Sequence, residues 1–419
     1  MQHDPRSLAI TTESAAAAQD FDAAVMALLG QKAEAGARLG AALAADPLLV
    51  AGHALAGFAQ MLAARRPLIA EAMASLARAR DAIAARGATP RERALTQALA
   101  CWTEGGDMDR AAAGLEAMVQ EDPHDILALR LSHGIRFMLG QAAEMRHAIE
   151  GALPRWDATM QGYAYLLGCH AFALEETGDA ARAEVVGRRA VAMEPGDLWG
   201  AHAVAHAIGA QGRMREGIAW LRWLEPNLAG GSNFVRHVHW HRALFHLALG
   251  QNEEALALYD RQVWAAPSED VRDLMNAAHL LWRLQAAGMP VGARRWEALA
   301  DIAERRIGEQ AWAFADLHYV LALGGAGRDE AASRMIAAIA AHAERETDSQ
   351  ARLHAEVGLG AARAVAAAMA GAATDARCGF DAVLPRLHDL GGSHAQRSVF
   401  VAMRDRAARD AGGAALRRG

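Results

Sequence analysis

Five glycines recur at nearly constant intervals through the middle of the chain, and this spacing constrains the fold more than any other feature. Gly106, Gly140, Gly178, Gly212 and Gly250 each follow an apolar-periodic segment, with separations of 34, 38, 34 and 38 residues. Glycine readily adopts the left-handed backbone conformation that ends many helices. Alanine is abundant, whereas β-branched and aromatic residues are sparse. The pattern therefore predicts pairs of short amphipathic helices joined by tight turns.

The segment 164–197 sets the register of the repeat. Gly178, Ala183, Ala190 and Pro195 fall at the glycine, alanine, alanine and proline positions of the tetratricopeptide motif, whose period is about 34 residues. Small residues let the paired helices cross closely, and proline ends the second helix. We therefore predict an all-α fold of tetratricopeptide-type helix pairs forming one curved α-solenoid. Its expected parts are an irregular helical cap (1–95), a repeat core (96–270), and C-terminal helical repeats with a cap (271–419).

Charge and composition exclude several classes of function. A formal net charge of −6 and a pI near 6.3 argue against a nucleic-acid partner. The chain lacks a run of about 18 uncharged apolar residues, so we expect no membrane-spanning helix. Lys32 is the only lysine among 43 basic residues, which excludes a P-loop and makes Schiff-base chemistry unpromising. Cys101, Cys169 and Cys378 are widely spaced and lack a CxxC, so we expect reduced, buried thiols in a cytoplasmic protein.

Two short stretches concentrate histidine. The sequence reads "HAVAH" at 202–206 and "HVHWH" at 237–241. Histidines four residues apart share one face of a helix and can bind one metal ion together. The repeat register turns His202 and His206 toward the concave face, not into the core, and places His237 and His241 on the next first helix. We expect the two pairs to face each other.

Other polar and aromatic residues belong to the same predicted groove. Two of them flank the histidine pairs, and the others lie on the preceding helix or further downstream: Trp199, Trp240, Tyr165, Phe172, Glu175, Glu176, Asp316 and His318. A carboxylate beside a histidine can act as a general base or as a ligand. Asp316 and His318 are two residues apart, so at most one of them faces the groove. His239 and His246 are expected to pack between helices.

Three functions remain open at this point. The groove can bind a small polar molecule or a peptide through its histidines and tryptophans, without turnover. Alternatively, the chain is an enzyme of metal-assisted or general acid–base chemistry, such as hydrolysis, with His206, His241 and Glu176 as catalytic groups. In that case the four groove histidines are the candidate ligands of a divalent metal such as zinc. The third alternative is a homodimeric scaffold with no ligand, in which the histidines only order the groove.

Several stretches resemble the tetratricopeptide repeat protein 38 family. They are "LWGAHAVAHAIGAQGRMREGIAWL", "HVHWHRALFHLALGQNEEALALYD", "LLWRLQAAGMPVGARRW" and "LGGSHAQRSVF", and the N-terminal segment is similar to that of bacterial members. The resemblance covers nearly the whole chain. It implies an α-solenoid with polar groove residues, and it adds Arg397 to the candidate site. The chain departs from the family pattern at Val238 and His239, and Ser398 replaces the family's acidic residue after Arg397.

Overall fold

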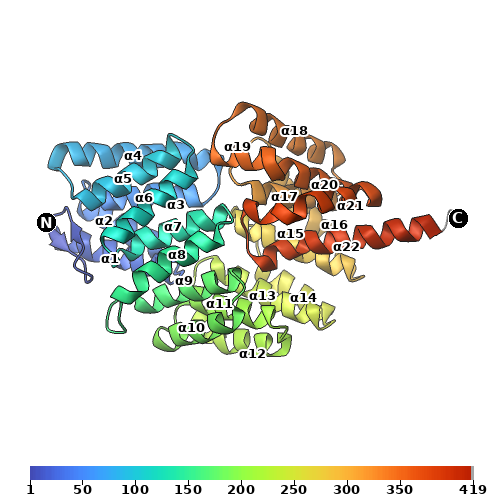
Figure 1. Cartoon of the computed structure of the whole chain (residues 1–419), viewed down its shortest axis with the longest axis horizontal. Helices are drawn as coiled ribbons and strands as arrows, with labels where there is room; N and C mark the ends of the chain where they lie inside the picture. Colours follow the sequence, from blue (N-terminus) through green and yellow to red (C-terminus); the bar gives the residue numbers. More distant parts are fainter. Residues whose placement is uncertain (417–419) are drawn as a thin grey trace. The chain divides into compact units, whose positions relative to one another are not determined.

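The computed structural model describes residues 1–416, and their regular secondary structure is helical apart from two short strands and an isolated bridge (Figure 1). Consecutive helices form pairs, and the chain divides into two compact units. Unit 1 comprises Met1–Phe137 and Gln141–Val238, and unit 2 comprises Met138–Gly140 and His239–Gly419. The prediction of an all-α helical-repeat solenoid of the tetratricopeptide type is confirmed.

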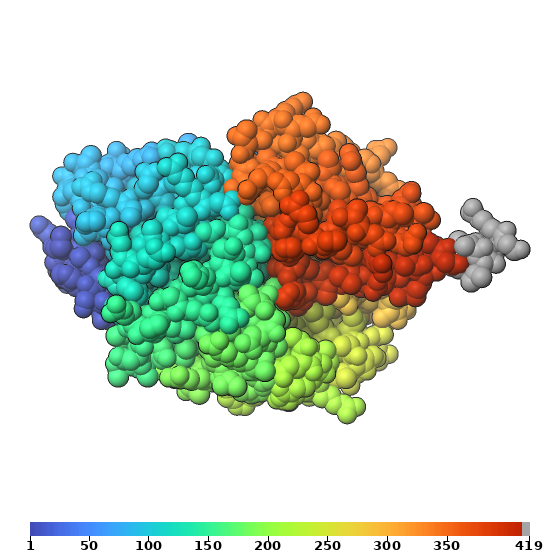
Figure 2. Space-filling model, viewed as in Figure 1, coloured from blue at the N-terminus to red at the C-terminus, as the bar shows by residue number. Residues whose placement is uncertain are grey.

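The helices of unit 1 and its boundary are α1 (Ala15–Leu29), α2 (Ala35–Ala45), α3 (Val50–Leu62), α4 (Arg66–Arg86), α5 (Pro90–Thr103), α6 (Met108–Glu121), α7 (Ile126–Met138), α8 (Ala142–Ala152), α9 (Tyr163–Glu176), α10 (Ala180–Met193), α11 (Leu198–Ala210), α12 (Met214–Leu224) and α13 (Phe234–Ala248). Two short strands, β1 (Gln2–His3) and β2 (Ala9–Ile10), pair in antiparallel fashion before them. Short 3-10 turns, η1 (Leu153–Arg155) and η2 (Glu225–Leu228), follow α8 and α12. Side chains of α4 to α6 form a continuous surface in the space-filling view (Figure 2, light blue to cyan).

Unit 2 contains α14 (Asn252–Leu258), α15 (Val271–Ala286), α16 (Ala293–Arg305), α17 (Ala313–Gly325), α18 (Asp329–Arg345), α19 (Ser349–Leu353), α20 (Leu359–Met369), α21 (Ala373–Val383) and α22 (His394–Leu416). Two π-helical segments, η3 (Tyr259–Val263) and η4 (His354–Gly358), extend α14 and α19, and a 3-10 segment, η5 (Leu384–Leu390), precedes α22. In the described part of the chain, no helix is both long enough and apolar enough to span a bilayer.

The repeated glycines end helices as predicted. All five have positive φ, for example 88° at Gly178 and 73° at Gly212, which is the conformation that closes a helix before a tight turn. The helices also approach closely at a small residue of the motif. A β-carbon on Gly200 of α11 would lie 3.4 Å from Cβ of Ala190 on α10, and a β-carbon on Gly187 of α10 would lie 2.6 Å from Cγ2 of Val204 on α11. The register deduced for residues 164–211 is therefore correct.

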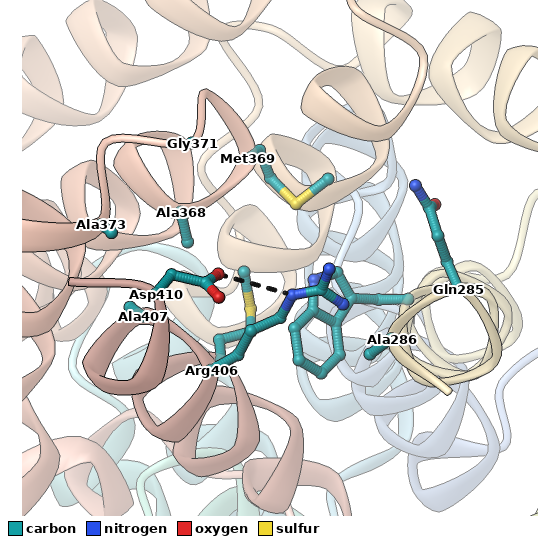
Figure 3. Close-up of a pocket in the computed structure, with 11 residues that line it drawn as sticks. Gln285, Ala286, Ala368, Met369, Gly371, Ala373, Arg406, Ala407 and Asp410 are labelled. Carbon is teal, nitrogen blue, oxygen red and sulfur yellow. Dashed lines mark ion pairs between the residues drawn. The ribbon is translucent and has the colours of Figure 1, made fainter. Parts of the chain in front are cut away.

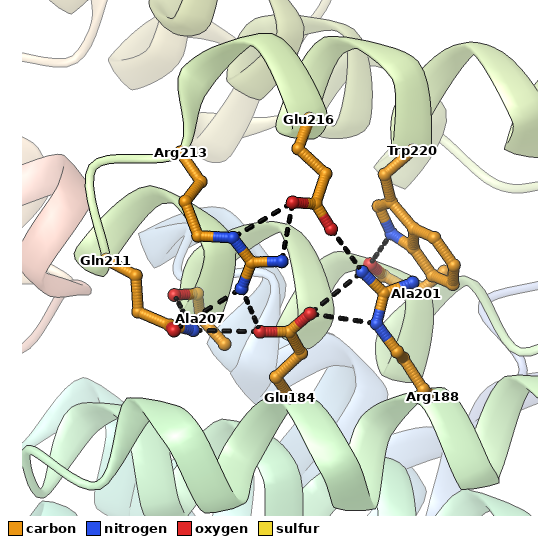
Figure 4. A network of polar contacts seen from close by, with 8 residues as sticks. All are labelled: Glu184, Arg188, Ala201, Ala207, Gln211, Arg213, Glu216 and Trp220. Atoms are coloured by element: carbon orange, nitrogen blue, oxygen red, sulfur yellow. Dashed lines mark hydrogen bonds and ion pairs between the residues drawn. The ribbon is translucent and has the colours of Figure 1, made fainter.

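An ion-pair network holds the second helices of two consecutive repeats together (Figure 4). Glu184 of α10 contacts Arg213 at 2.5 Å and Arg188 at 2.8 Å, and both arginines also contact Glu216 of α12. Arginine suits this role because its planar fork of N–H groups can bind two carboxylates at once. Trp220 of α12 donates its indole N–H to the carbonyl of Ala201, 2.9 Å away, which fixes α12 against α11.

A second contact links the two ends of unit 1. Residues 31–33, in the turn after α1, pair with residues 230–232, in the turn before α13. The N–H of Ala33 donates to the carbonyl of Gly230 (2.9 Å), and the N–H of Ser232 donates to the carbonyl of Gln31 (2.8 Å). We call this pairing the clasp.

One expectation about the cysteines is wrong. Cys169 is buried and Cys101 is half-buried, but Cys378 is exposed. The buried stripe of α21 contains Ala376 and Phe380, so Cys378, which is two residues from each, points outward.

Candidate functional site

Helix α11 carries the first histidine pair, and most residues of this helix are buried. Asp197 caps the helix by accepting from the N–H of Gly200 at 3.0 Å. Alanines and glycines fill most of the remaining positions, so neighbouring helices come close on every side. His202 and His206 are only 2% and 4% exposed. The expectation that His202 and His206 are not buried is therefore wrong.

Three histidines from two helices converge in this buried place. Nε2 of His202 lies 2.9 Å from Nε2 of His237 on α13. Each of His202, His206 and His237 has a ring nitrogen within 4.8 Å of a ring nitrogen of the other two. We call these three residues the histidine cluster. His241 follows His237 by one turn of α13, so the two share a face of that helix as predicted.

Aromatic rings enclose the histidine cluster and explain its burial. Phe172 of α9 stacks on His202, with centroids 5.6 Å apart, and meets His206 edge-on at 5.4 Å. Phe234, at the start of α13, meets His202 edge-on, with ring centroids 5.0 Å apart. Trp199 contacts Phe172, His202 and Phe234. Phe234 does not belong to either histidine motif, and no pattern in the sequence marks it as part of the site.

The two carboxylates predicted on α9 lie beside the cluster. Glu175 and Glu176 are 4% and 8% exposed. Oε2 of Glu175 lies 3.2 Å from Nδ1 of His206, and each of Glu175, Glu176 and His206 has a potential ligand atom within 4.8 Å of the other two. A carboxylate on one ring nitrogen of a histidine fixes the ring and raises the basicity of the opposite nitrogen. Glu175 is thus placed to orient His206.

Asp197 is an unusual helix cap because its carboxylate is completely buried. A β-carbon on Gly168 or Gly200 would lie 2.6 or 2.4 Å from its Oδ2, so this oxygen fits only because both residues are glycine. Burial raises the pKa of Asp197 to about 7, and the N–H groups of Gly200 and Trp199 oppose the rise. An ionised carboxylate is therefore disfavoured at the start of α11.

Two residues of α7 also belong to this aromatic region and were missed by the sequence analysis. The guanidinium carbon of Arg130 lies 4.4 Å from the ring centroid of Trp199. His133 packs against Phe172 and Trp199, at 5.8 Å from each, and burial lowers the pKa of its imidazole well below its usual value. The repeat register could have found Arg130, because Arg130 precedes Gly140 by the same interval at which His202 precedes Gly212.

Tyr165 and Trp240, both predicted to line the groove, pack against other parts of the structure. Tyr165 lies against the turn after α1, where its hydroxyl would be 3.1 Å from a β-carbon on Gly30, and burial raises its pKa. Trp240 is fully buried in unit 2, with its ring 4.9 Å from that of His279 on α15. Both depart from the expected groove position because a neighbouring element packs directly on the side chain.

The downstream candidates lie in unit 2. Asp316 faces His354, with Oδ2 and Nε2 3.0 Å apart, whereas Nδ1 of His318 bonds the carbonyl of Phe314 at 2.9 Å. The two side chains thus have different partners, as positions two apart on a helix would. Burial lowers the pKa of His318 to about 4. Arg397 donates to the carbonyl of Gly392, so it secures the turn that begins α22.

Unit 2 also contains an open cavity of about 220 Å³ between α15, α20, α21 and α22 (Figure 3). Its wall is formed by Trp282, Met369 and Met403 with several alanines. Arg406 and Asp410, 3.8 Å apart, lie at its edge. None of the residues predicted for the site lines this cavity.

No protein-family model matches the chain. Among solved structures, the chain is similar to Naa15/Naa10 bound to HypK-THB, with 14% identity, 94% of this chain and 60% of that chain covered, and a TM-score of 0.29. It is also similar to the TPR domain of P58(IPK), with 11% identity, 78% and 99% coverage, and a TM-score of 0.22. The chain thus spans less than two thirds of the first neighbour. The fold assignment rests on the helix pairs and glycine register of the chain itself.

Proposed function

We propose that this chain is a tetratricopeptide-type protein that binds a divalent transition metal, such as zinc, through the histidine cluster. The observation that carries this proposal is the convergence of three imidazoles from α11 and α13 within 4.8 Å in a buried place. Zinc binds imidazole nitrogen at about 2.0–2.1 Å, so two such nitrogens on one ion are separated by a little over 3 Å. The 2.9 Å between His202 and His237 is close to that separation.

Glu175 supports the same proposal. A histidine that ligates a metal almost always contacts a carboxylate, carbonyl or water through its other ring nitrogen. Glu175 makes this contact with Nδ1 of His206. His241 shares a face of α13 with His237 by its four-residue spacing, and its role as a ligand stays a prediction from the sequence.

The enclosure of the cluster favours an ion or a very small polar ligand over a peptide. A peptide needs an extended, accessible groove, but the histidine rings are at most 9% exposed. A tetratricopeptide-type fold suggests a protein-interaction scaffold as well, and protein partners, a second copy of the chain included, would then bind elsewhere on the surface. We also propose membership of the tetratricopeptide repeat protein 38 family, because the residues of the cluster fall within the stretches that resemble it.

Metal-assisted hydrolysis is a second candidate function, favoured by Glu176. Its carboxylate lies within 4.8 Å of Glu175 and His206, which gives the site an acid–base group next to the proposed ligands. A bound metal would supply a water of lowered pKa, and Glu176 would accept its proton.

Metal analysis of the purified protein tests the first proposal. We expect one equivalent of zinc after exposure to zinc and dialysis, and loss of that zinc in His206→Ala and His237→Ala. His147→Ala is the matched control, because His147 is exposed on α8. Equal metal content in all four proteins, or none in any, would contradict the proposal. Hydrolysis of an activated ester by the zinc-loaded protein, absent in Glu176→Gln with zinc retained, distinguishes the second function from binding alone.

A further inference from the structure

A chain of four titratable side chains runs into the core of unit 2. Oδ2 of Asp348 lies 3.1 Å from Nε2 of His342 on α18. Nδ1 of His342 lies 3.0 Å from Nδ1 of His354, at the start of η4. Nε2 of His354 lies 3.0 Å from Oδ2 of Asp316 on α17. The order is therefore carboxylate, imidazole, imidazole, carboxylate, and none of these residues belongs to the proposed metal site.

The two ends of this chain differ in their access to solvent. The side chain of Asp348 is 31% exposed, whereas Asp316 and His354 are fully buried. The backbone also makes room for the inner ring. A β-carbon on Gly358 would lie 2.8 Å from Cδ2 of His354, and His354 begins a π-helical segment, which is a local irregularity frequent at functional sites.

Counting protons shows what the arrangement requires. Each neutral imidazole carries one N–H, and a contact between two ring nitrogens holds only if one of them donates. If both rings donated through Nε2 to a carboxylate, two lone pairs would face each other across the 3.0 Å between the Nδ1 atoms. Three contacts in a row therefore need three protons. With both rings neutral, the third proton belongs to one of the two carboxyl groups.

We propose that Asp348, His342, His354 and Asp316 form a proton relay that connects solvent to a buried carboxyl group. In the resting state, Asp316 is protonated and donates to Nε2 of His354, Nδ1–H of His354 donates to His342, and Nε2–H of His342 donates to ionised Asp348. In the shifted state, the Asp316 proton has moved to His354, the His354 proton to His342, and the His342 proton to Asp348. Both rings are neutral before and after, and one negative charge has moved from Asp348 to Asp316.

The surroundings favour the resting state. Burial raises the pKa of Asp316, and the nearby carboxylate of Glu309 raises it further, against the opposing effect of His354 and His342. The pKa of Asp348 is shifted in the opposite direction. Burial raises its pKa, but the hydrogen bonds from His342 and from the N–H groups of Ala351 and Gln350 lower it overall.

The contact between His354 and Asp316 fits this assignment. The 3.0 Å between Nε2 and Oδ2 is the length of a hydrogen bond, so one of the two groups must supply the proton. Because burial raises the pKa of Asp316, the proton of this contact is assigned to its carboxyl group and His354 accepts it through Nε2. The other carboxylate oxygen of Asp316 has no hydrogen-bond partner among residues 1–412. The relay thus ends at an oxygen that can exchange a proton with a bound water or polar ligand.

Nuclear magnetic resonance of the full-length protein with ¹⁵N-labelled histidine tests the relay. At neutral pH we expect opposite tautomers, Nδ1–H for His354 and Nε2–H for His342, assigned through His354→Asn and His342→Asn. We also expect the Nδ1 proton of His354 to exchange with solvent about tenfold more slowly in Asp348→Asn, because exit then requires local opening of the fold. Asparagine retains the helix-capping role of Asp348, so α19 is preserved. Nε2–H tautomers on both rings would overturn the proposal.

Two further measurements complete the test. Glu356→Gln alters an exposed carboxylate of the same π-helical segment, which pairs with Arg386, and should leave the exchange rate unchanged. Equal slowing in both variants, or slowing in neither, would also refute the relay. Infrared spectroscopy should show the carbonyl band of a buried carboxylic acid that disappears in Asp316→Asn and is retained in Asp197→Asn, which removes the other buried carboxyl group of raised pKa. Absence of that band from the wild-type spectrum would overturn the resting state and with it the proposal.

Discussion

Replacement of Asp197 by asparagine should stabilise the protein at alkaline pH. Asp197 has a pKa of about 7 in the folded chain and 3.8 as the reference value, because the folded structure buries its carboxylate between Gly168 and Gly200. Each unit of pKa shift corresponds to about 1.4 kcal/mol, so full ionisation of this group opposes folding by about 4 kcal/mol.

The sign follows from proton binding. Well below pH 3.8 the carboxyl group is protonated in both states and has no effect on stability. As the pH rises toward 7, the unfolded chain ionises while the folded chain keeps its proton, so the free energy of unfolding falls. Asparagine stays neutral and keeps the oxygen that accepts from the N–H of Gly200. The stability of Asp197→Asn relative to wild type should therefore rise by about 3 kcal/mol between pH 5 and pH 8.

Urea unfolding followed by circular dichroism at both pH values measures this difference. Asp107→Asn is the control, since Asp107 caps α6 in the same way but is only half-buried, and its side chain accepts from the N–H of Arg110 at 2.9 Å. We expect no comparable change for this variant. A relative stability of Asp197→Asn that is the same at pH 5 and pH 8 would show that the carboxylate is accommodated in its ionised form, and the reasoning would fail.

Three further outcomes follow from the contacts described. Glu175→Gln should weaken zinc binding by about 10–100-fold, measured by competition with a chromophoric chelator, because the amide no longer stabilises the ligating form of the ring; unchanged affinity would remove Glu175 from the site. Gly187→Ala should lower the free energy of unfolding by about 1–3 kcal/mol by forcing a β-carbon against Val204, whereas Gly151→Ala, with open space around it, should not destabilise. Glu184→Gln should lower stability by about 1 kcal/mol or less and reduce its dependence on salt concentration; equal loss at low and high salt would contradict this.

The helix pairs could be predicted from sequence because the residues that end a helix are local signals. Gly178 and Pro195 act on their own segment of backbone, so their spacing predicts helix boundaries without knowledge of packing. The face on which His202 and His206 lie follows from the same register. Their burial does not, because it depends on Phe172 and Phe234, which belong to other helices.

The contacts missed by the sequence analysis are those between distant segments. No pattern in the sequence around His354 predicts Asp316 as its neighbour, because the two residues meet only when η4 packs against α17. His133 is similar, since its neighbours Phe172 and Trp199 come from two later helices. Asp197 shows the same limit for electrostatics. Its role as a helix cap can be predicted from the sequence, but its raised pKa depends on the packing of two glycines around its carboxylate.

The clasp between residues 31–33 and 230–232 affects how unit 1 can unfold. In an open repeat array each helix pair contacts only its neighbours, so the terminal pair is a free end from which the array frays. Here the turn after α1 is hydrogen-bonded to the turn before α13. Loss of α1 would thus release the start of α13, where Phe234 and His237 lie. Unfolding at the N-terminal end of unit 1 would therefore disturb the histidine cluster.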